Sequence, residues 1–146
     1  MKTARSSVTA ILLAAGQSRR MGAFKPLLPF GKTTVIESCL KYLTSGGVDS
    51  IVVVVGYRAD DIRERLSNYS VVFAVNPDPT SEMAASIAIG VRQLPDSADA
   101  VLISPADYPA IPPVVIASIV GEWSKGSRLV KPTCSYYERV RGLGQR

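Results

Sequence analysis

The segment LLAAGQSRRMGAFK, residues 12–25, combines residue types that could bind phosphate. Gly16 has no Cβ, so the backbone around it can present N–H groups to an anion. One hydroxyl and three cations follow it: Ser18, Arg19, Arg20 and Lys25. Arginine grips two phosphate oxygens as a fork, and lysine acts as a point charge. We therefore predict that this segment binds the phosphates of a nucleotide; the alternative is a solvated basic loop without a ligand.

Two familiar phosphate loops do not match this segment. A Walker A loop has a glycine five positions before its Gly-Lys-Ser/Thr, but Pro26 holds that position before Gly31-Lys32-Thr33. A dinucleotide-binding G-x-G-x-x-G motif that began at Gly16 would need glycine in place of Ser18, and Gly22 comes one residue late. The segment is therefore a different kind of glycine loop.

The remaining composition restricts the chemistry. The chain has no histidine, which excludes Ser-His and Cys-His catalysis and removes the commonest transition-metal ligand. Its two cysteines, Cys39 and Cys134, lack the spacing of a zinc site and are expected to be free thiols. Catalysis would have to use carboxylates, cations, hydroxyls or a metal bound through oxygen.

Four apolar runs alternate with helical patterns along the chain. The runs cover residues 8–14, 51–55, 71–75 and 100–103, and their lack of polar alternation favours parallel strands buried on both faces. Apolar stripes at helical spacing follow them in residues 35–43, 59–66, 83–94 and 116–123. In the third stripe we expect these side chains to face the core: Met83, Ile87, Val91 and Leu94. The order predicts a three-layer, doubly wound, mostly parallel, Rossmann-like α/β fold.

In such a fold, ligands bind in the loops at the carboxyl ends of the strands. The loops concerned are residues 15–26, 56–58, 76–82 and 104–109. Residues at the predicted helix ends support the helix boundaries: Thr33 or Thr34 and Gly46-Gly47 for the first helix, Asp60 and Asp61 for the second.

Length and charge describe one globular domain. The chain of 146 residues suffices for one core, and 47% hydrophobic with 20% charged residues is an ordinary soluble composition. Part of the net charge of +5 lies in residues 131–146, where a solvated end is favoured over a nucleic-acid arm. The first apolar run is too short to span a membrane, and it continues into the glycine loop, which argues against a cleaved secretion signal. We expect a cytoplasmic protein without nucleic-acid or membrane partners.

Four segments resemble a known family. LAAGQSRRMGAFKPLLPFGKTTVIE resembles the opening of the MobA-like nucleotidyltransferases, most closely the molybdenum cofactor cytidylyltransferases. Every fixed position of their motif L-A-A-G-x-S-x-R-M-G-x-x-K is present from Leu13 to Lys25. VVVVG (52–56) resembles the family's second strand and turn, and NPDPTSEMAASIAIGV is similar to N-P…G-M-x-x-S-L-x-x-G-L. PADYP (105–109) stands where the family has its metal-binding aspartate. The resemblance implies the fold of nucleotide-diphospho-sugar transferases.

The resemblance also implies roles for matching residues. Those implied for nucleotide binding are Leu13, Ala14, Ala15, Gly16, Ser18, Arg20, Lys25, Asn76 and Ser86. Those implied for catalysis are Arg20 and Lys25, on the triphosphate, and Asp107, as the Mg²⁺ ligand. For Asp107, a plain turn-initiating aspartate is the alternative.

The implied reaction transfers an NMP to a phosphorylated acceptor, such as the molybdopterin cofactor, and releases pyrophosphate. Ala15 stands where guanylyl-transferring members tend to have glycine, which favours CTP over GTP. An acceptor phosphate is already an anion near neutral pH. Attack on the α-phosphorus therefore requires alignment and charge neutralisation rather than a histidine base, and Mg²⁺ would contribute to both.

The sequence departs from the family pattern in two regions. Glu82 stands where the family usually has glycine, and after residues 129–133 the family's Gly-His-Pro turn and second metal-binding aspartate have no counterpart. We expect a single domain over 1–146 that is incomplete at its C-terminus, with a divergent basic tail at 134–146. An uncovered sheet edge would favour a homo-oligomer. The alternatives are a nucleotide-binding or regulatory domain without turnover, and a sugar-phosphate nucleotidyltransferase.

Overall fold

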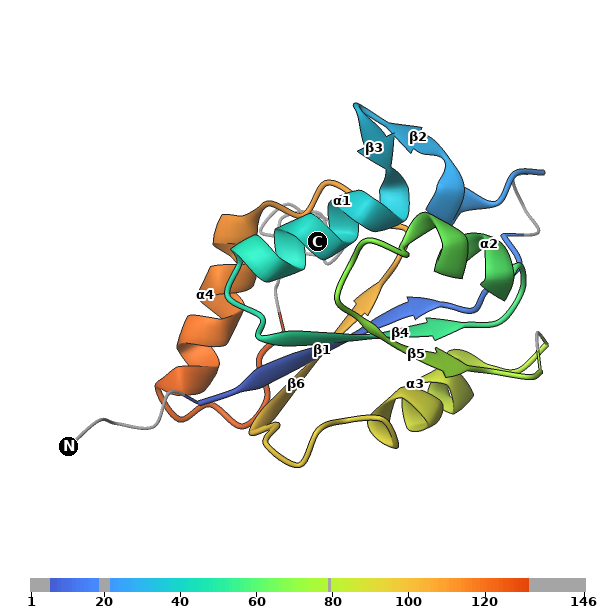
Figure 1. The fold of residues 1–146 in the computed structure, drawn as a ribbon. Helices are drawn as coiled ribbons and strands as arrows, with labels where there is room; N and C mark the ends of the chain where they lie inside the picture. The colour runs from blue at the N-terminus through green and yellow to red at the C-terminus, as the bar shows by residue number, and fades with distance from the viewer. Residues whose placement is uncertain (1–5, 19–21, 79, 132–146) are drawn as a thin grey trace, which may run out of the picture.

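The structure, a computed structural model, describes residues 6–18, 22–78 and 80–131. Its centre is a parallel sheet with the strand order β5-β4-β1-β6 (Figure 1). The strands are β1 (Val8–Ala14), β4 (Ser50–Val55), β5 (Val72–Val75) and β6 (Ala100–Pro105). All four apolar runs are therefore strands, and the predicted doubly wound α/β fold is confirmed. The chain steps outward from β1 to β5 and then crosses back, so the strand order reverses between β1 and β6.

Helices cover both faces of this sheet (Figure 1). One face carries α1 (Val35–Ser45), α2 (Ala59–Arg65) and α4 (Pro113–Ser124), and the other carries α3 (Met83–Val91). In β1, Leu12 belongs to the larger core on the first face, whereas Ile11 packs with Val52 and Val54 on the α3 side. Successive residues of a strand point to opposite faces, so a run without polar residues fits a sheet covered on both sides.

The face of α3 that meets the sheet differs from the predicted one. Met83 is 61% exposed and Val91 is 46% exposed, whereas the buried residues of the helix are Ser86 and Gly90. A Cβ at Gly90 would lie only 2.7 Å from Ile11 Cγ2. Interiors are closely packed, so the small residues face the sheet where the helix approaches it most closely. The predicted stripe was wrong for Met83 and Val91, whereas Leu94 packs against the smaller core as predicted. Close approach at Gly90 moves the buried face of the helix away from Met83 and Val91.

Between β1 and α1 the chain makes an excursion that the apolar pattern does not predict. A 3-10 turn, η1 (Lys25–Leu27), leads into an antiparallel hairpin of β2 (Pro29–Phe30) and β3 (Thr33–Thr34). Gly31 at the hairpin turn has a φ of 60°, a left-handed conformation that glycine adopts without steric cost. The hairpin ends at Thr34, the N-cap of α1, and Gly46 is the C-cap, so the predicted bounds of this helix are confirmed.

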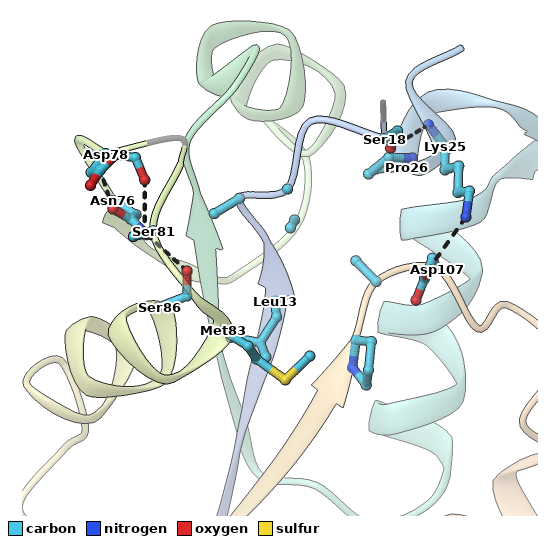
Figure 2. A pocket seen from close by; sticks show the side chains of 15 residues that line it. Leu13, Ser18, Lys25, Pro26, Asn76, Asp78, Ser81, Met83, Ser86 and Asp107 are labelled. Atoms are coloured by element: carbon cyan, nitrogen blue, oxygen red, sulfur yellow. Dashed lines mark hydrogen bonds and ion pairs between the residues drawn. The ribbon is translucent and has the colours of Figure 1, made fainter. Parts of the chain in front are cut away.

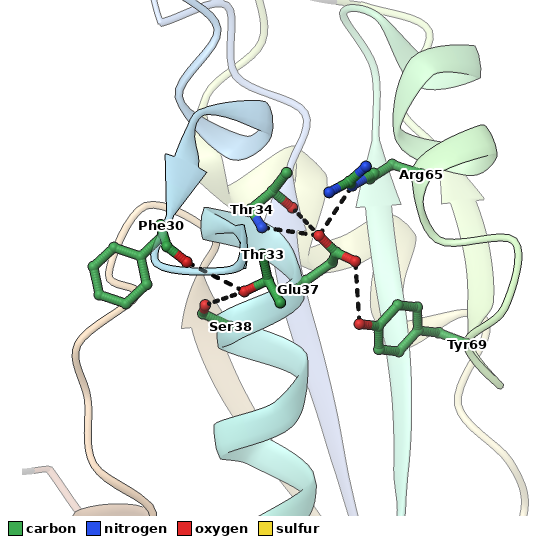
Figure 3. Close-up of polar contacts among 7 residues, drawn as sticks. All are labelled: Phe30, Thr33, Thr34, Glu37, Ser38, Arg65 and Tyr69. Carbon is green, nitrogen blue, oxygen red and sulfur yellow. Dashed lines mark hydrogen bonds and ion pairs between the residues drawn. The ribbon is translucent and has the colours of Figure 1, made fainter.

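Glu37 joins the start of α1 to the segment around α2 (Figure 3). Its Oε2 accepts hydrogen bonds from the backbone N and Oγ1 of Thr34, both at 2.8 Å, and from Arg65 Nε at 2.9 Å. Its Oε1 accepts a hydrogen bond from the Tyr69 hydroxyl at 3.2 Å. Burial raises the pKa of Glu37, but the hydrogen bonds from Thr34 and Arg65 outweigh it and hold that pKa below its ordinary value of 4.5.

Within the described residues, β6 lies at one edge of the sheet. Val101 and Ile103 on this strand are 41% and 48% exposed. No helix in the described part of the chain is both long and apolar enough to cross a bilayer. Several features named from the sequence lie outside the described residues: Arg19, Arg20, Cys134 and the basic tail 134–146.

Candidate functional site

A cleft of about 310 Å³ opens at the carboxyl ends of β1 and β6 (Figure 2). It lies where the strand order reverses, the position at which open α/β sheets bind ligands. Its volume is at the lower end of the range for small-molecule sites. The residues that line it are Leu13, Ala14, Ala15, Gly16, Ser18, Lys25, Pro26, Asn76, Asp78, Ser81, Met83, Ser86, Pro105, Ala106 and Asp107.

One side of the cleft carries the cation–carboxylate pair of Lys25 and Asp107. Ser18 has a left-handed backbone with φ 52°, and its Oγ accepts a hydrogen bond from the backbone N of Lys25 at 3.3 Å. Lys25 Nζ lies 3.8 Å from Asp107 Oδ2, and the two side chains are 35% and 43% exposed. An ion pair this open contributes about 0–1 kcal/mol. Lys25 and Asp107 can therefore separate to receive a phosphate and a cation at little cost.

The opposite side is a hydrogen-bonded wall built around Asn76 (Figure 2). Asn76 is 5% exposed, and its Nδ2 donates to Ser81 Oγ at 2.7 Å and to Ser86 Oγ at 2.9 Å. Its Oδ1 accepts a hydrogen bond from the backbone N of Asp78 at 3.0 Å. Both amide protons are thus used inside the protein, so Asn76 shapes the wall. Ser86 accepts from Asn76 and keeps its own hydroxyl proton to donate.

Asp78 stabilises the loop at the rim of this wall. Its Oδ1 accepts hydrogen bonds from the hydroxyl of Thr80 at 2.7 Å and from the backbone N of Thr80 at 2.9 Å. These two bonds, the side-chain one first, lower the pKa of Asp78 below its usual value. The carboxylate is therefore ionised at neutral pH and holds Thr80 against Asp78.

The backbone between the two sides is closely packed at one glycine and open at another. A Cβ at Gly56, after β4, would lie 3.1 Å from the carbonyl oxygen of Ala15 and 3.2 Å from that of Asn76. A Cβ at Gly16 would meet no atom within 4 Å. Gly16 lines the cleft, so the lack of a side chain there leaves open space in the cleft. Unlike Gly56, it is not needed to avoid a close contact with the described residues. Gly22 has a left-handed backbone with φ 63°, a conformation that glycine adopts without steric cost.

The structure brings the predicted site residues to one place. The cleft is lined by Leu13, Ala14, Ala15, Gly16, Ser18, Lys25, Asn76, Ser86 and Asp107, whereas Arg20 lies outside the described residues. Their functions stay predictions. Sequence reasoning missed Pro26, Asp78, Ser81, Met83, Pro105 and Ala106 as lining residues. Asp78 and Ser81 could have been found from their turn-forming sequence, but Met83 lines the cleft because α3 is rotated from its expected orientation.

Glu82, which replaces the family's usual glycine, does not line the cleft. It is the exposed N-cap residue of α3, with φ −72° and ψ 162°. This is ordinary extended backbone that any residue adopts. The substitution therefore introduces no backbone strain at this position.

The comparisons with known proteins agree with this geometry. A parallel sheet covered on both faces, with a cleft where the strand order reverses, defines the class of doubly wound α/β proteins. Residues 10–138 match the MobA-like NTP transferase domain, and the chain belongs to this family.

Three relatives illustrate the similarity. The 2-C-methyl-D-erythritol 4-phosphate cytidylyltransferase of Rhodococcus opacus (strain B4) is 31% identical over 145 residues, 97% of this chain and 62% of that protein. The molybdenum cofactor cytidylyltransferase of Escherichia coli (strain K12) is 32% identical over 87 residues, 59% of this chain and 45% of that protein. A solved nucleotidyl transferase from Methanothermobacter thermautotroptrophicus has a TM-score of 0.74 and 33% identity, covering 79% of this chain and 57% of that one. This chain spans less than two thirds of each relative.

Proposed function

We propose that this protein transfers CMP from CTP to a phosphorylated small-molecule acceptor, such as the molybdopterin cofactor, and releases pyrophosphate. The observation that carries the proposal is the division of one cleft into two sides. Lys25 and Asp107 present a cation and a carboxylate on one side, whereas the other side presents the uncharged hydrogen-bonding groups of Asn76 and Ser86, with the Asp78 carboxylate at its rim bonded to Thr80. A nucleoside triphosphate is divided in the same way, because its base is uncharged and its phosphates are anionic.

The transfer needs alignment and charge neutralisation. An oxygen of the acceptor phosphate attacks the α-phosphorus, and the bond from that phosphorus to the oxygen bridging to the β-phosphate breaks. Pyrophosphate leaves with the electron pair. Lys25 neutralises negative charge on the phosphates, and the family resemblance assigns Arg20 to the same task. The acceptor is ionised near neutral pH, so no general base is required.

Asp107 suits a magnesium ion that arrives with the triphosphate. Proteins often hold Mg²⁺ through one or two carboxylates together with phosphate oxygens and water. Asp107 supplies one such carboxylate, 43% exposed, beside Lys25 in the cleft. The described residues contain no group of three His, Cys, Asp or Glu side chains that would form a protein cage for a metal. When bound, the ion would neutralise phosphate charge.

The preference for CTP is supported by the relatives, because two of those described above are named cytidylyltransferases. Ser86 Oγ accepts from Asn76 Nδ2, so its hydroxyl proton is directed away from Asn76 and can be donated to an acceptor atom on a base. Every nucleobase offers such an acceptor, so this hydroxyl suits a base without selecting cytosine.

Calorimetric titration with CTP, GTP and ATP, each with and without Mg²⁺, tests the nucleotide. We expect CTP to bind most tightly and to bind more tightly with Mg²⁺. Lys25→Ala should weaken binding, whereas Lys125→Ala should not, because Lys125 pairs with Glu122 on α4 outside the cleft. Equal loss in both variants, or no binding of any nucleotide, would refute the assignment of the cleft.

Pyrophosphate release tests turnover. Wild-type protein with CTP, Mg²⁺ and a phosphorylated acceptor should release pyrophosphate, and Asp107→Asn should abolish the release. Tight CTP binding without pyrophosphate release for any phosphorylated acceptor would favour the alternative, a nucleotide-binding domain without turnover.

A further inference from the structure

Phe24, which directly precedes Lys25, is contacted by two residues of the turn after β4, Tyr57 and Arg58. Its side chain is 7% exposed and belongs to the larger core. The ring of Tyr57 meets the ring of Phe24 edge to face, with centroids 5.6 Å apart and an interplanar angle of 77°. The guanidinium carbon of Arg58 lies 5.2 Å from the Phe24 centroid. Both geometries are attractive for an aromatic ring.

The turn that supplies Tyr57 and Arg58 is itself fixed. A Cβ at Gly56 would be in tight contact, at 3.1–3.2 Å, with the carbonyl oxygens of Ala15 and Asn76, so the turn is packed against the backbone of both residues. Arg58 has a left-handed backbone with φ 55°, an unfavourable conformation that the surrounding packing must maintain. Its Nε donates a hydrogen bond to Asp61 on α2, which orients the guanidinium.

We propose that Tyr57 and Arg58 are positioning residues that hold Phe24 and thereby fix Lys25 for the phosphates. Neither Tyr57 nor Arg58 lines the cleft, so they would act through Phe24 and not as ligands. Lys25 has a weak ion pair with Asp107, a backbone hydrogen bond to Ser18 Oγ, and a carbonyl oxygen that accepts from the backbone N of Leu28 at 3.1 Å. These bonds are local to the loop and η1, so the buried ring of Phe24 is the neighbouring group that joins this segment to the core. This inference rests on the proposed function for its catalytic consequence.

Two variants and two matched controls test the proposal. Tyr57→Ala removes the edge-to-face contact, and Tyr57→Phe retains it. Arg58→Ala removes the cation over Phe24, and Arg63→Ala removes a similar cation that lies 5.4 Å from the Phe73 ring, outside the cleft. Tyr57 is 46% exposed, so Tyr57→Ala is expected to remain folded, which circular dichroism will verify.

The first readout is hydrogen exchange of the Lys25 amide in a peptide covering residues 22–28, measured without any nucleotide. We expect faster exchange in Tyr57→Ala and Arg58→Ala, and wild-type exchange in Tyr57→Phe and Arg63→Ala. Unchanged exchange in both of the first two variants would overturn the proposal. This readout does not depend on turnover, so it judges the positioning role even if the proposed transferase function fails.

The second readout is CTP affinity in a double-mutant cycle with Lys25→Ala. An edge-to-face aromatic contact is equivalent to at most about a ten-fold change in an equilibrium constant, so we expect Tyr57→Ala to weaken CTP binding by up to about ten-fold. In the Lys25→Ala background the same change should have little further effect, because residues that act together are not additive. A full additional loss in that background would show that Tyr57 does not act through Lys25.

Discussion

The glycines Gly90 and Gly121 provide a matched test of how α3 is held on the sheet. Replacing glycine with alanine inside a helix is favourable by about 0.5–1 kcal/mol, because glycine loses more backbone entropy on folding. A Cβ at Gly121, in α4, would meet no atom within 4 Å. Gly121→Ala should therefore raise the free energy of unfolding by about 0.5–1 kcal/mol.

Gly90→Ala has the same gain in helix propensity, but the new Cβ would collide with side chains of the sheet. Its Cβ would lie 2.7 Å from Ile11 Cγ2 and 3.0 Å from Val54 Cγ2, and both of these side chains are 0% exposed. Overpacking in a closely packed core costs about 1–3 kcal/mol. The net effect should be a loss of about 1 kcal/mol. The two variants should then differ by the collision alone, about 1–3 kcal/mol.

Urea denaturation of wild type and both variants, followed by far-ultraviolet circular dichroism, gives the two free energies. Gly90 lies one helical turn after Ser86, whose Oγ is 2.9 Å from Asn76 Nδ2. Displacement of α3 should therefore weaken CTP binding in Gly90→Ala and leave it unchanged in Gly121→Ala. If Gly90→Ala were as stabilising as Gly121→Ala, the close approach of α3 to β1 and β4 would be wrong.

Three other predictions concern single side chains. Glu37→Gln should lower the free energy of unfolding by about 1–2 kcal/mol at pH 7, because it removes a charged acceptor of several hydrogen bonds. The folded-state pKa of Glu37 is lowered, so the wild-type advantage is complete above pH 4.5 and is lost as the pH falls through the folded pKa; urea titrations at pH 7 and pH 3 check this. Burial, followed by the charge of Asp107, raises the pKa of Cys39 to about 11, so iodoacetamide at pH 8 should leave it unmodified until urea is added, as mass spectrometry would detect. Asn76→Asp should lose both hydrogen bonds donated by Nδ2 and destabilise the fold by about 1–3 kcal/mol, whereas Ser81→Ala removes one of them and should cost less in thermal unfolding.

The sequence predicts the sheet well because each strand is an uninterrupted apolar run between turn residues. It predicts most of the cleft because residues at the carboxyl ends of parallel strands must share one edge of the sheet. It failed for α3, where the packing of Gly90 against Ile11 depends on a three-dimensional contact rather than on helical spacing. The contact between Phe24 and Tyr57 could not be predicted from the sequence for the same reason, because it joins two loops that are far apart along the chain.

The central position of β1 has a consequence for the nascent chain. Among the strands of the described residues, β1 comes earliest along the chain, yet it pairs with β4 and β6 on its two sides. The contacts at its start, from Val8 to Asp49 and from Ser7 to Asp99, span 41 and 92 residues. Such distant pairings close slowly, and an apolar strand without its neighbours is prone to aggregation. VTAILLA must therefore remain shielded on the ribosome until β6 emerges, and Asp107 follows directly after β6, so the complete cleft exists only in chains synthesised past that residue.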